Sequence, residues 1–232
     1  MAHKVWHHHG QMSEAFRTVM FLSASGGLQD AYTYIGRGKV FANAQTGNIV
    51  LMSQAAFNGD LSRVLHYLIP LLSFALGVAV AEAIHIRYRE AKRLHWRQLV
   101  LLVEILLLFG VGFIPNTLDL AANALVSFAC AMQVQAFRKV HGYPFASTMC
   151  IGNMRSGMES LVVYFHLHDK KVLHKALHYF GVILLFAIGA GVGAHCVAAF
   201  GNKTIWFSCA LLLVSLCFMF IQDEEEALKE KA

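Results

Sequence analysis

Three long apolar stretches decide what kind of fold this chain can adopt. They cover residues 64–84, 98–114 and 204–221. A helix needs about 20 largely apolar residues to cross the hydrocarbon core of a bilayer, which is about 30 Å thick. Only 14% of the residues are charged and 57% are hydrophobic, whereas a soluble domain averages about 25% charged residues. The sequence therefore predicts an all-α membrane protein that crosses the bilayer several times.

Six membrane spans are expected in total, because stretches 16–35, 118–137 and 172–198 are also long and mainly apolar. Two further apolar segments, 44–57 and 154–165, are too short to cross comfortably, so we expect broken or re-entrant helices there. The connector 85–97 is strongly basic. With six spans and both termini in the cytoplasm, this connector and most other Lys and Arg residues lie on the cytoplasmic side, as the positive-inside rule requires.

An internal repeat divides the predicted single membrane domain, residues 1–232, into halves 16–115 and 118–221, with polar tails 1–13 and 222–232. The segment VLHYLIPLLSFALGVAVA of the first half aligns without a gap with ALHYFGVILLFAIGAGVG of the second. Each half contains three spans, so the second half enters the membrane from the opposite face. The expected fold is a 3+3 inverted repeat with a broken segment after the first helix of each half.

Two copies of a motif interrupt the repeat at corresponding places. SASGGLQDAYTYIGRGKVFANAQTGNIVLM begins at Ser23, and AMQVQAFRKVHGYPFASTMCIGNMRS begins at Ala131. The first copy is interrupted at Gly26 and Gly27, and the second around Gly142 and Pro144. In inverted-repeat transporters, discontinuous helices of this kind meet near the bilayer midplane and bind the substrate. Transport is inferred here by analogy of architecture.

The pattern GGLQDAYTYI…FANAQTGNIV, the weaker MQVQAF…PFASTMCIGNMRS and the FALG and FAIG helices resemble the YoaK-like family of bacterial membrane proteins, domain of unknown function 1275. The resemblance extends over nearly the whole chain, about residues 16–221. It implies a multi-pass protein of the bacterial inner membrane, and it implies no established activity.

Asp30 is the first candidate functional residue, because a charge within a membrane span costs about 2.5–3.5 kcal/mol and normally faces water or a partner. Gln29 beside it adds a hydrogen-bonding amide. The structural alternative is that Asp30 caps the following short segment or pairs with Arg37.

The sequence Thr46-Gly47-Asn48 is the second candidate, because a half-helix beginning there would direct free N–H groups at an anion or a polar substrate. An N-cap without a ligand is the alternative. In the second copy, Asn153 corresponds to Asn48 and Gln135 replaces the aspartate, so an ion site should be asymmetric. The predicted substrate-binding residues are Gln29, Asp30, Thr46, Asn48, Gln135 and Asn153.

Two glutamates lie within predicted spans. Glu104 lies about 10 Å along its helix from Arg97, at 1.5 Å per residue, so we expect it within the hydrocarbon as a group that couples protons or cations to transport. A hydrogen-bonded structural glutamate is the alternative. Glu82 lies nearer the basic connector, where it can pair with Arg87 or Arg89.

Other function classes find little support. The five cysteines include no CxxC pair, and the histidine-rich segment 166–174 lacks a recognised ligand spacing, so neither a metal nor a cofactor is expected. No soluble domain carries the basic stripe that nucleic-acid binding requires. Hydrolase and nucleotide-binding motifs are missing from the sequence, so we expect no enzyme.

The predicted function is a small secondary transporter or permease for a small molecule or an ion, with the lipid bilayer as its surroundings. A mass of 25.7 kDa is small for a transporter and is compatible with a homodimer. The alternative is a non-transporting membrane scaffold or partner-binding subunit. The sequence leaves the substrate, the coupling ion and the direction of transport open.

Overall fold

A computed structural model describes residues 16–88, 95–140, 143–144 and 147–229 of the protein. Nearly all of them are helical, as predicted. The α-helices are α1 (Phe16–Ala31), α2 (Gln45–Phe57), α3 (Leu61–Tyr88), α4 (Trp96–Val111), α5 (Asp119–Ala136), α6 (Cys150–Leu167), α7 (Lys170–Phe200) and α8 (Ile205–Lys229). Between α5 and α6, the two-residue strands β1 (Lys139–Val140) and β2 (Tyr143–Pro144) pair antiparallel.

Three helical stretches of the described residues are long and apolar enough to cross a membrane. They are Leu61–Tyr88, Asn116–Ala136 and Lys170–Phe220. The third combines α7, the 3-10 turn Gly201–Thr204 and most of α8. Helices α1 and α4 have 16 residues each, about 24 Å at 1.5 Å per residue. A π-helical turn, Tyr32–Gly36, lengthens α1.

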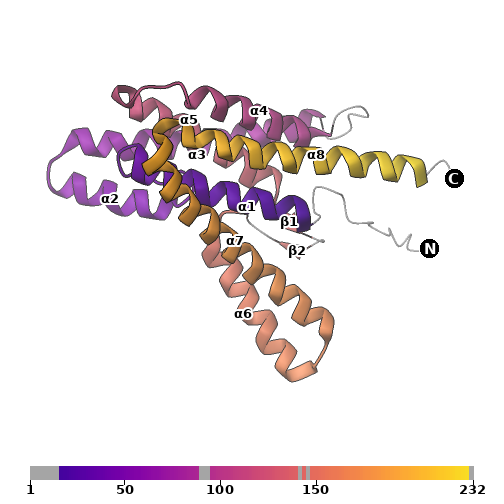
Figure 1. The fold of residues 1–232 in the computed structure, drawn as a ribbon. Coiled ribbons are helices and arrows are strands. Elements are labelled where there is room, and N and C mark those ends of the chain that lie inside the picture. Colours follow the sequence, from indigo (N-terminus) through magenta and orange to yellow (C-terminus); the bar gives the residue numbers. More distant parts are fainter. Residues whose placement is uncertain (1–15, 89–94, 141–142, 145–146, 230–232) are drawn as a thin grey trace.

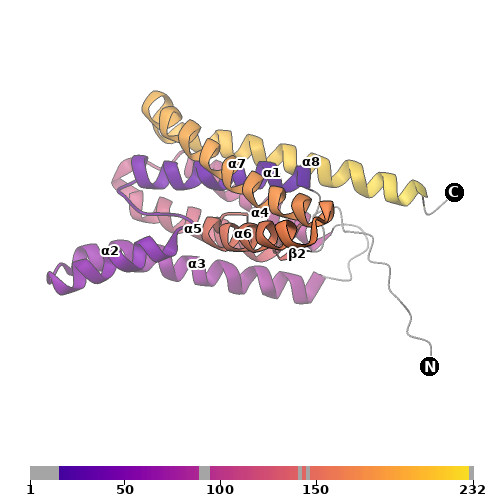
Figure 2. The same ribbon diagram turned by 90° about the horizontal axis from the view of Figure 1, so that it is seen from below.

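The helices form a bundle with a projecting hairpin. Figure 1 shows α1, α3, α4, α5 and α8 running alongside one another, while α6 and α7 leave the bundle at an angle. The beginning of α1 and the end of α8 lie at the same end of the bundle. In Figure 2, α2 extends beside α3 near the opposite end, and these two helices are in contact.

Close helix crossings have a symmetric pattern. Helix α1 packs against α7 and α8, while α5 packs against α3 and α4. The short helix α2 lies on α3, α6 lies on α7, and α4 contacts α8. At two crossings a glycine faces the partner backbone: a Cβ on Gly77 of α3 would overlap the Phe128 carbonyl of α5, and a Cβ on Gly189 of α7 would overlap the Ala24 carbonyl of α1. The small residues therefore permit close packing of these pairs.

Among the helix boundaries that differ from the predicted ones, two concern the second half of the chain. Helix α6 begins at Cys150 rather than at residue 154, and α8 continues to Lys229 through the acidic tail that was expected to follow the last span. Glu, Ala, Leu and Lys in that tail are strong helix formers, which explains the extension. The polar tail 1–13 lies outside the described residues, as do Gly142, Phe145 and Ala146 of the second motif copy.

Candidate functional site

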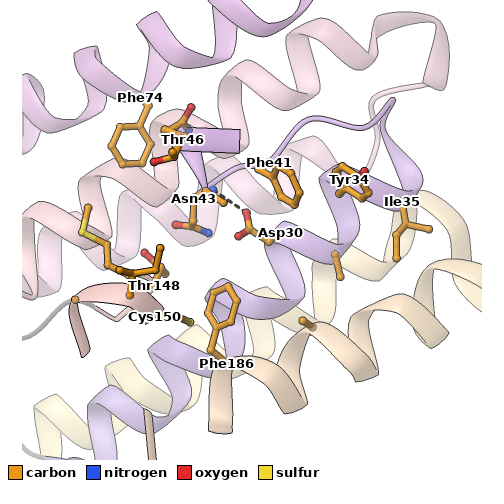
Figure 3. A pocket seen from close by; sticks show the side chains of 17 residues that line it. Asp30, Tyr34, Ile35, Phe41, Asn43, Thr46, Phe74, Thr148, Cys150 and Phe186 are labelled. Carbon is orange, nitrogen blue, oxygen red and sulfur yellow. Dashed lines mark hydrogen bonds between the residues drawn. The ribbon is translucent and has the colours of Figure 1, made fainter. Parts of the chain in front are cut away.

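A cavity of about 730 Å³ lies where helices α2 and α6 begin. Figure 3 shows it between Phe74 of α3 and Phe186 of α7, with Asp30 of α1 at its wall. Besides these three residues, the lining consists of Ala31, Tyr34, Ile35, Phe41, Ala190 and residues 43–46 and 148–152. Both broken segments predicted from the sequence therefore reach one cavity. Most of its wall is apolar or aromatic, and none of the described lining residues is Lys, Arg or His.

Asp30 both lines this cavity and holds the loop that leads into α2. Its side chain is 7% exposed, and its Oδ1 accepts a hydrogen bond of 2.7 Å from the backbone N–H of Asn43. The backbone N–H groups of Ala42 and Ala44 also point to this carboxylate. The amide of Asn43 donates to the Gly26 carbonyl at 3.3 Å, which ties the loop to α1. Arg37 pairs with Asp119 rather than with Asp30.

Thr46 and Asn48 have different roles at the start of α2. The helix begins at Gln45 after Ala44, which provides no side-chain cap, so Thr46, Gly47 and Asn48 belong to its first turn. Thr46 lines the cavity. Asn48 is fully buried, and its amide forms hydrogen bonds with both backbone groups of Phe41. Its Oδ1 accepts from the Phe41 N–H at 2.9 Å, and its Nδ2 donates to the Phe41 carbonyl at 2.7 Å.

Gln29 faces away from the cavity lining into a separate polar cluster. Its Nε2 donates to Ser25 Oγ at 3.0 Å, Ser208 Oγ at 2.9 Å and Glu104 Oε1 at 3.3 Å. The thiol of Cys130 donates to Gln29 Oε1. Glu104 is fully buried, and its Oε2 has no hydrogen-bond partner among the described residues. The structure thus brings Gln29 and Glu104 together between α1, α4, α5 and α8.

The remaining predicted residues do not line the cavity. Gln135 is half-buried on α5 and donates to the Glu82 carboxylate of α3. Glu82 also contacts His85 at 3.4 Å and forms no ion pair with Arg87; Arg89, the other predicted partner, lies outside the described residues. Asn153 is 3% exposed in the first turn of α6, one residue after the lining residue Gly152. Of the six predicted binding residues, the structure places Asp30 and Thr46 at the cavity.

Several lining residues were missed by reasoning from the sequence. Phe74 and Phe186 come from opposite walls of the cavity, and Thr148 and Asn43 lie between them (Figure 3). Tyr34 and Phe41 stack on each other with ring centroids 4.4 Å apart. A usable signal existed, because the repeat alignment places Phe74 opposite Phe186. In the sequence, both residues served only as matching positions of the repeat and of the FALG and FAIG segments.

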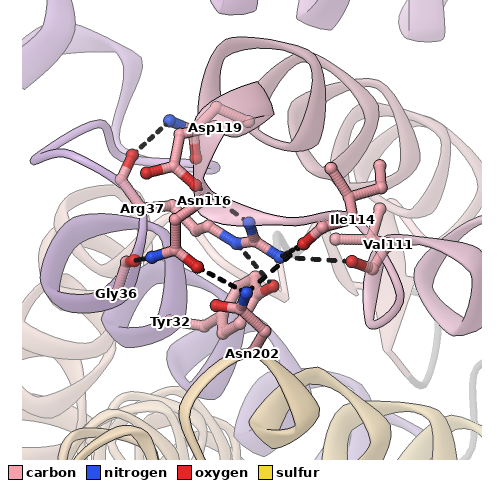
Figure 4. Close-up of polar contacts among 9 residues, drawn as sticks. Tyr32, Gly36, Arg37, Val111, Ile114, Asn116, Asp119 and Asn202 are labelled. Carbon is pink, nitrogen blue, oxygen red and sulfur yellow. Dashed lines mark hydrogen bonds and ion pairs between the residues drawn. The ribbon is translucent and has the colours of Figure 1, made fainter.

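A second buried polar cluster surrounds Arg37 (Figure 4). Its side chain is fully buried, and its guanidinium donates to Tyr32 Oη and Asp119 Oδ1, each at 2.8 Å, and to the Ile114 carbonyl at 2.7 Å. Asn123 donates to the Arg37 carbonyl at 2.6 Å. The cluster connects the end of the π-helical turn with the α4–α5 connection. All these partners are protein groups, so the cluster has a structural role.

Comparison with known proteins agrees with the membrane fold. Residues 18–218 match the sequence model of a family described as "Protein of unknown function (DUF1275)". The chain is also similar to the UPF0700 transmembrane protein YoaK of Bacillus subtilis (strain 168), with 26% identity over 209 residues that cover 85% of this chain and 92% of that protein. No solved structure matches the chain. Because the family match covers most of the sequence, this membrane protein belongs to the DUF1275 family, as its motifs predicted.

Proposed function

We propose that the protein is a small secondary transporter or permease of the bacterial inner membrane. The observation that carries this proposal is the cavity of about 730 Å³ at the beginnings of α2 and α6, with the Asp30 carboxylate in its wall. Ligand cavities in proteins measure about 300–1,000 Å³ and combine apolar walls with a few polar groups. Charged residues within membrane segments usually mark a substrate or ion path. Both features coincide here.

The contacts between helices support a 3+3 inverted repeat. Exchanging the first four α-helices with the last four, in order, converts the α1–α7 contact into α5–α3 and the α1–α8 contact into α5–α4. The α2–α3 contact becomes α6–α7, and the α4–α8 contact maps onto itself. The cavity wall follows the same exchange, since Phe74 corresponds to Phe186 and the start of α2 to the start of α6. A substrate site on such a symmetry axis is typical of inverted-repeat transporters.

The glycine contacts support a specific register for this repeat. Gly77 faces the Phe128 carbonyl and Gly189 faces the Ala24 carbonyl, so Ala24 corresponds to Phe128. In that register Gln29 corresponds to Gln133, and both are buried. Asp30 then corresponds to Val134, one residue from the position that the sequence alignment favoured. Either register leaves the acidic group in the first half only.

We further propose six spans with both termini in the cytoplasm. The start of α1 and the end of α8 lie at one end of the bundle (Figure 1), as an even number of spans requires. The basic connector between α3 and α4 then faces the cytoplasm, in agreement with the positive-inside rule. We retain a homodimer as the proposed assembly, because the chain is small for a transporter.

Glu104 is the proposed coupling group. It lies 3.3 Å from Gln29, the residue adjacent to Asp30 on α1. Its Oε2 has no hydrogen-bond partner among the described residues, and buried carboxylates in membranes commonly carry protons or cations.

Transport is tested with the full chain in liposomes, using a panel of labelled metabolites and ions. We expect uptake of at least one compound, and we expect Asp30→Asn to abolish it at normal expression. Asp60→Asn is the matched control, because Asp60 is an exposed residue before α3 that lies outside the cavity. No uptake of any compound, together with no ligand-induced shift in melting temperature, would favour the alternative of a non-transporting scaffold or partner-binding subunit.

A further inference from the structure

We infer that the cavity binds organic ammonium ions, that is, amines with an apolar or aromatic body. This inference rests on the proposed function, because it names the substrate class of the same cavity. Its first support is the charge of the lining. Asp30 is the acidic residue of the described lining, and no Lys, Arg or His accompanies it there. A carboxylate in an apolar wall is stabilised by a positively charged partner that also donates hydrogen bonds.

Backbone N–H groups orient the Asp30 carboxylate, but no cationic side chain neutralises it. Oδ1 accepts from the Asn43 N–H at 2.7 Å, and the N–H groups of Ala42 and Ala44 also point to the carboxylate. Asp30 takes part in none of the ion pairs of the described residues. Figure 3 shows the carboxylate between the two phenylalanine walls rather than behind them. An ammonium group paired with this carboxylate would therefore lie inside the cavity and close to the aromatic rings.

The aromatic residues favour a cation over a neutral ligand. Ring faces attract ammonium groups within about 6 Å of their centroids. The rings of Tyr34 and Phe41 stack on each other. The Nζ of Lys39 lies 4.9 Å from the centroid of the Tyr34 ring, so the Tyr34 ring already contacts two side chains. Phe74 and Phe186 make no ring contact with another aromatic side chain in the described part of the chain. These two rings are available to the ligand.

The N-termini of α2 and α6 lie at the cavity and favour anions. Their partial positive charge must therefore be compared with the negative charge of Asp30. A helix N-terminus carries roughly half a positive charge. The end of α2 already faces Asp30, whose carboxylate accepts the N–H of Asn43 just before that helix. The end of α6 remains, with Met149 and Ile151 around it. Half a charge at one helix end is weaker than the full charge of the carboxylate, so a cation is favoured over an anion.

Binding is measured with the full chain purified in detergent, by isothermal titration at pH 7.5, so that it does not depend on transport. The probes share one aromatic body: phenethylamine, 2-phenylethanol, phenylacetate and phenylalanine. We expect phenethylamine to bind about ten-fold or more tightly than 2-phenylethanol, which is the ratio that one charge-assisted hydrogen bond provides. Phenylacetate should bind most weakly, because it is repelled by Asp30.

Two variants test whether the ammonium group of phenethylamine binds at Asp30 and beside the Phe74 ring. Asp30→Asn should reduce phenethylamine binding to the level of 2-phenylethanol, whereas the control Asp60→Asn should not. Phe74→Leu keeps an apolar wall and should weaken phenethylamine more than 2-phenylethanol, which gives a second measurement if Asp30→Asn fails to fold. Binding of phenylacetate or phenylalanine at least as tight as that of phenethylamine overturns the inference, and so does the absence of binding by every probe. If phenethylamine binds and no compound of the transport panel enters liposomes, the ligand class stands and the transport proposal fails.

Discussion

Gln29 Nε2 donates to Glu104 Oε1 at 3.3 Å, and this contact connects the helix that carries the cavity aspartate to a fully buried glutamate on α4. Gln29 and Asp30 are neighbours in sequence, but their side chains enter different environments. Asp30 lines the cavity, while Gln29 enters the cluster with Ser25 and Ser208. A rotation of α1 that alters one environment must therefore alter the other. This arrangement gives the proposed coupling group a mechanical connection to the proposed ligand site.

Replacing Glu104 should separate its structural contribution from a role in coupling. Glu104→Gln preserves the shape of the side chain and should change the free energy of unfolding by less than about 1.5 kcal/mol. Glu104→Ala leaves a void and removes the partner of Gln29, so it should cost about 2–4 kcal/mol. Thermal unfolding in detergent, followed by tryptophan fluorescence, measures both effects.

Transport measurements on Glu104→Gln test its proposed role in coupling. If Glu104 couples ions to uptake, Glu104→Gln should retain phenethylamine binding but lose uptake driven by a pH gradient. Equal loss of binding in Glu104→Gln and Asp30→Asn would contradict the separation of the two sites.

The glycine at the α1–α7 crossing should tolerate no side chain. A Cβ at Gly189 would overlap the Ala24 carbonyl, whereas a Cβ at Gly191 in the same helix meets no atom within 4 Å. Gly→Ala within a helix normally stabilises it by roughly 0.5–1 kcal/mol. We therefore expect Gly191→Ala to be neutral or stabilising and Gly189→Ala to destabilise the protein by about 1–3 kcal/mol. Similar melting temperatures for the two variants would show that the crossing is looser than described.

Protons should compete with cationic ligands at the cavity. Protonation removes the negative charge of Asp30, so affinity for a cation should fall as the pH is lowered. Benzyltrimethylammonium is the probe, because its charge is permanent and any pH dependence then belongs to the protein. The other titratable lining residues are Tyr34 in the π-helical turn and Cys150 of α6, while α3 and α7 contribute none among the described residues.

The variants assign that pH dependence. Asp30→Asn should leave benzyltrimethylammonium binding weak and independent of pH between pH 5 and 8, whereas Cys150→Ser should retain the dependence of the unmodified chain. If Cys150→Ser removes it and Asp30→Asn does not, the titrating group has been misassigned. Isothermal titration at several pH values measures each case.

Sequence reasoning located the helices well because their signals are local. The apolar stretch 64–84 lies within α3, the stretch 204–221 lies within α8 except for Thr204, and the short segment 44–57 is α2 with one residue of difference. Asp30 was recognised because a charge in an apolar helix is conspicuous. Phe74 and Phe186 were not recognised as lining residues, since a phenylalanine in an apolar helix carries no local mark of a cavity. Their role depends on which helices meet, which is a tertiary property.

Two polar residues were misjudged for a related reason. Asn48 resembled a helix cap that would face a substrate, but its amide is occupied by the backbone of Phe41. Arg37 was considered only as an alternative partner of Asp30, but its side chain is fully buried and pairs with Asp119. Its partner Asp119 lies at the start of α5, and nothing in the spacing of the two residues along the chain indicates that they meet. Long-range hydrogen bonds of this kind are decided by packing.

The buried Arg37 cluster should be intolerant of even a conservative change. The guanidinium donates in several directions, to Tyr32 Oη, Asp119 Oδ1 and the Ile114 carbonyl, and a lysine ammonium cannot reproduce this planar set. Removing one member of a buried ion pair costs about 3–5 kcal/mol, so we expect Arg37→Met to lose about that much stability and Arg37→Lys to lose a smaller but measurable part. The control is Arg63→Lys, because Arg63 forms an exposed pair with Asp60 at 3.4 Å, and such pairs contribute about 0–1 kcal/mol. Melting temperatures of the three variants in the same detergent test the prediction. An Arg37→Lys variant as stable as Arg63→Lys would mean that the cluster is hydrated or open, and that the end of the π-helical turn is not fixed to the α4–α5 connection by these hydrogen bonds.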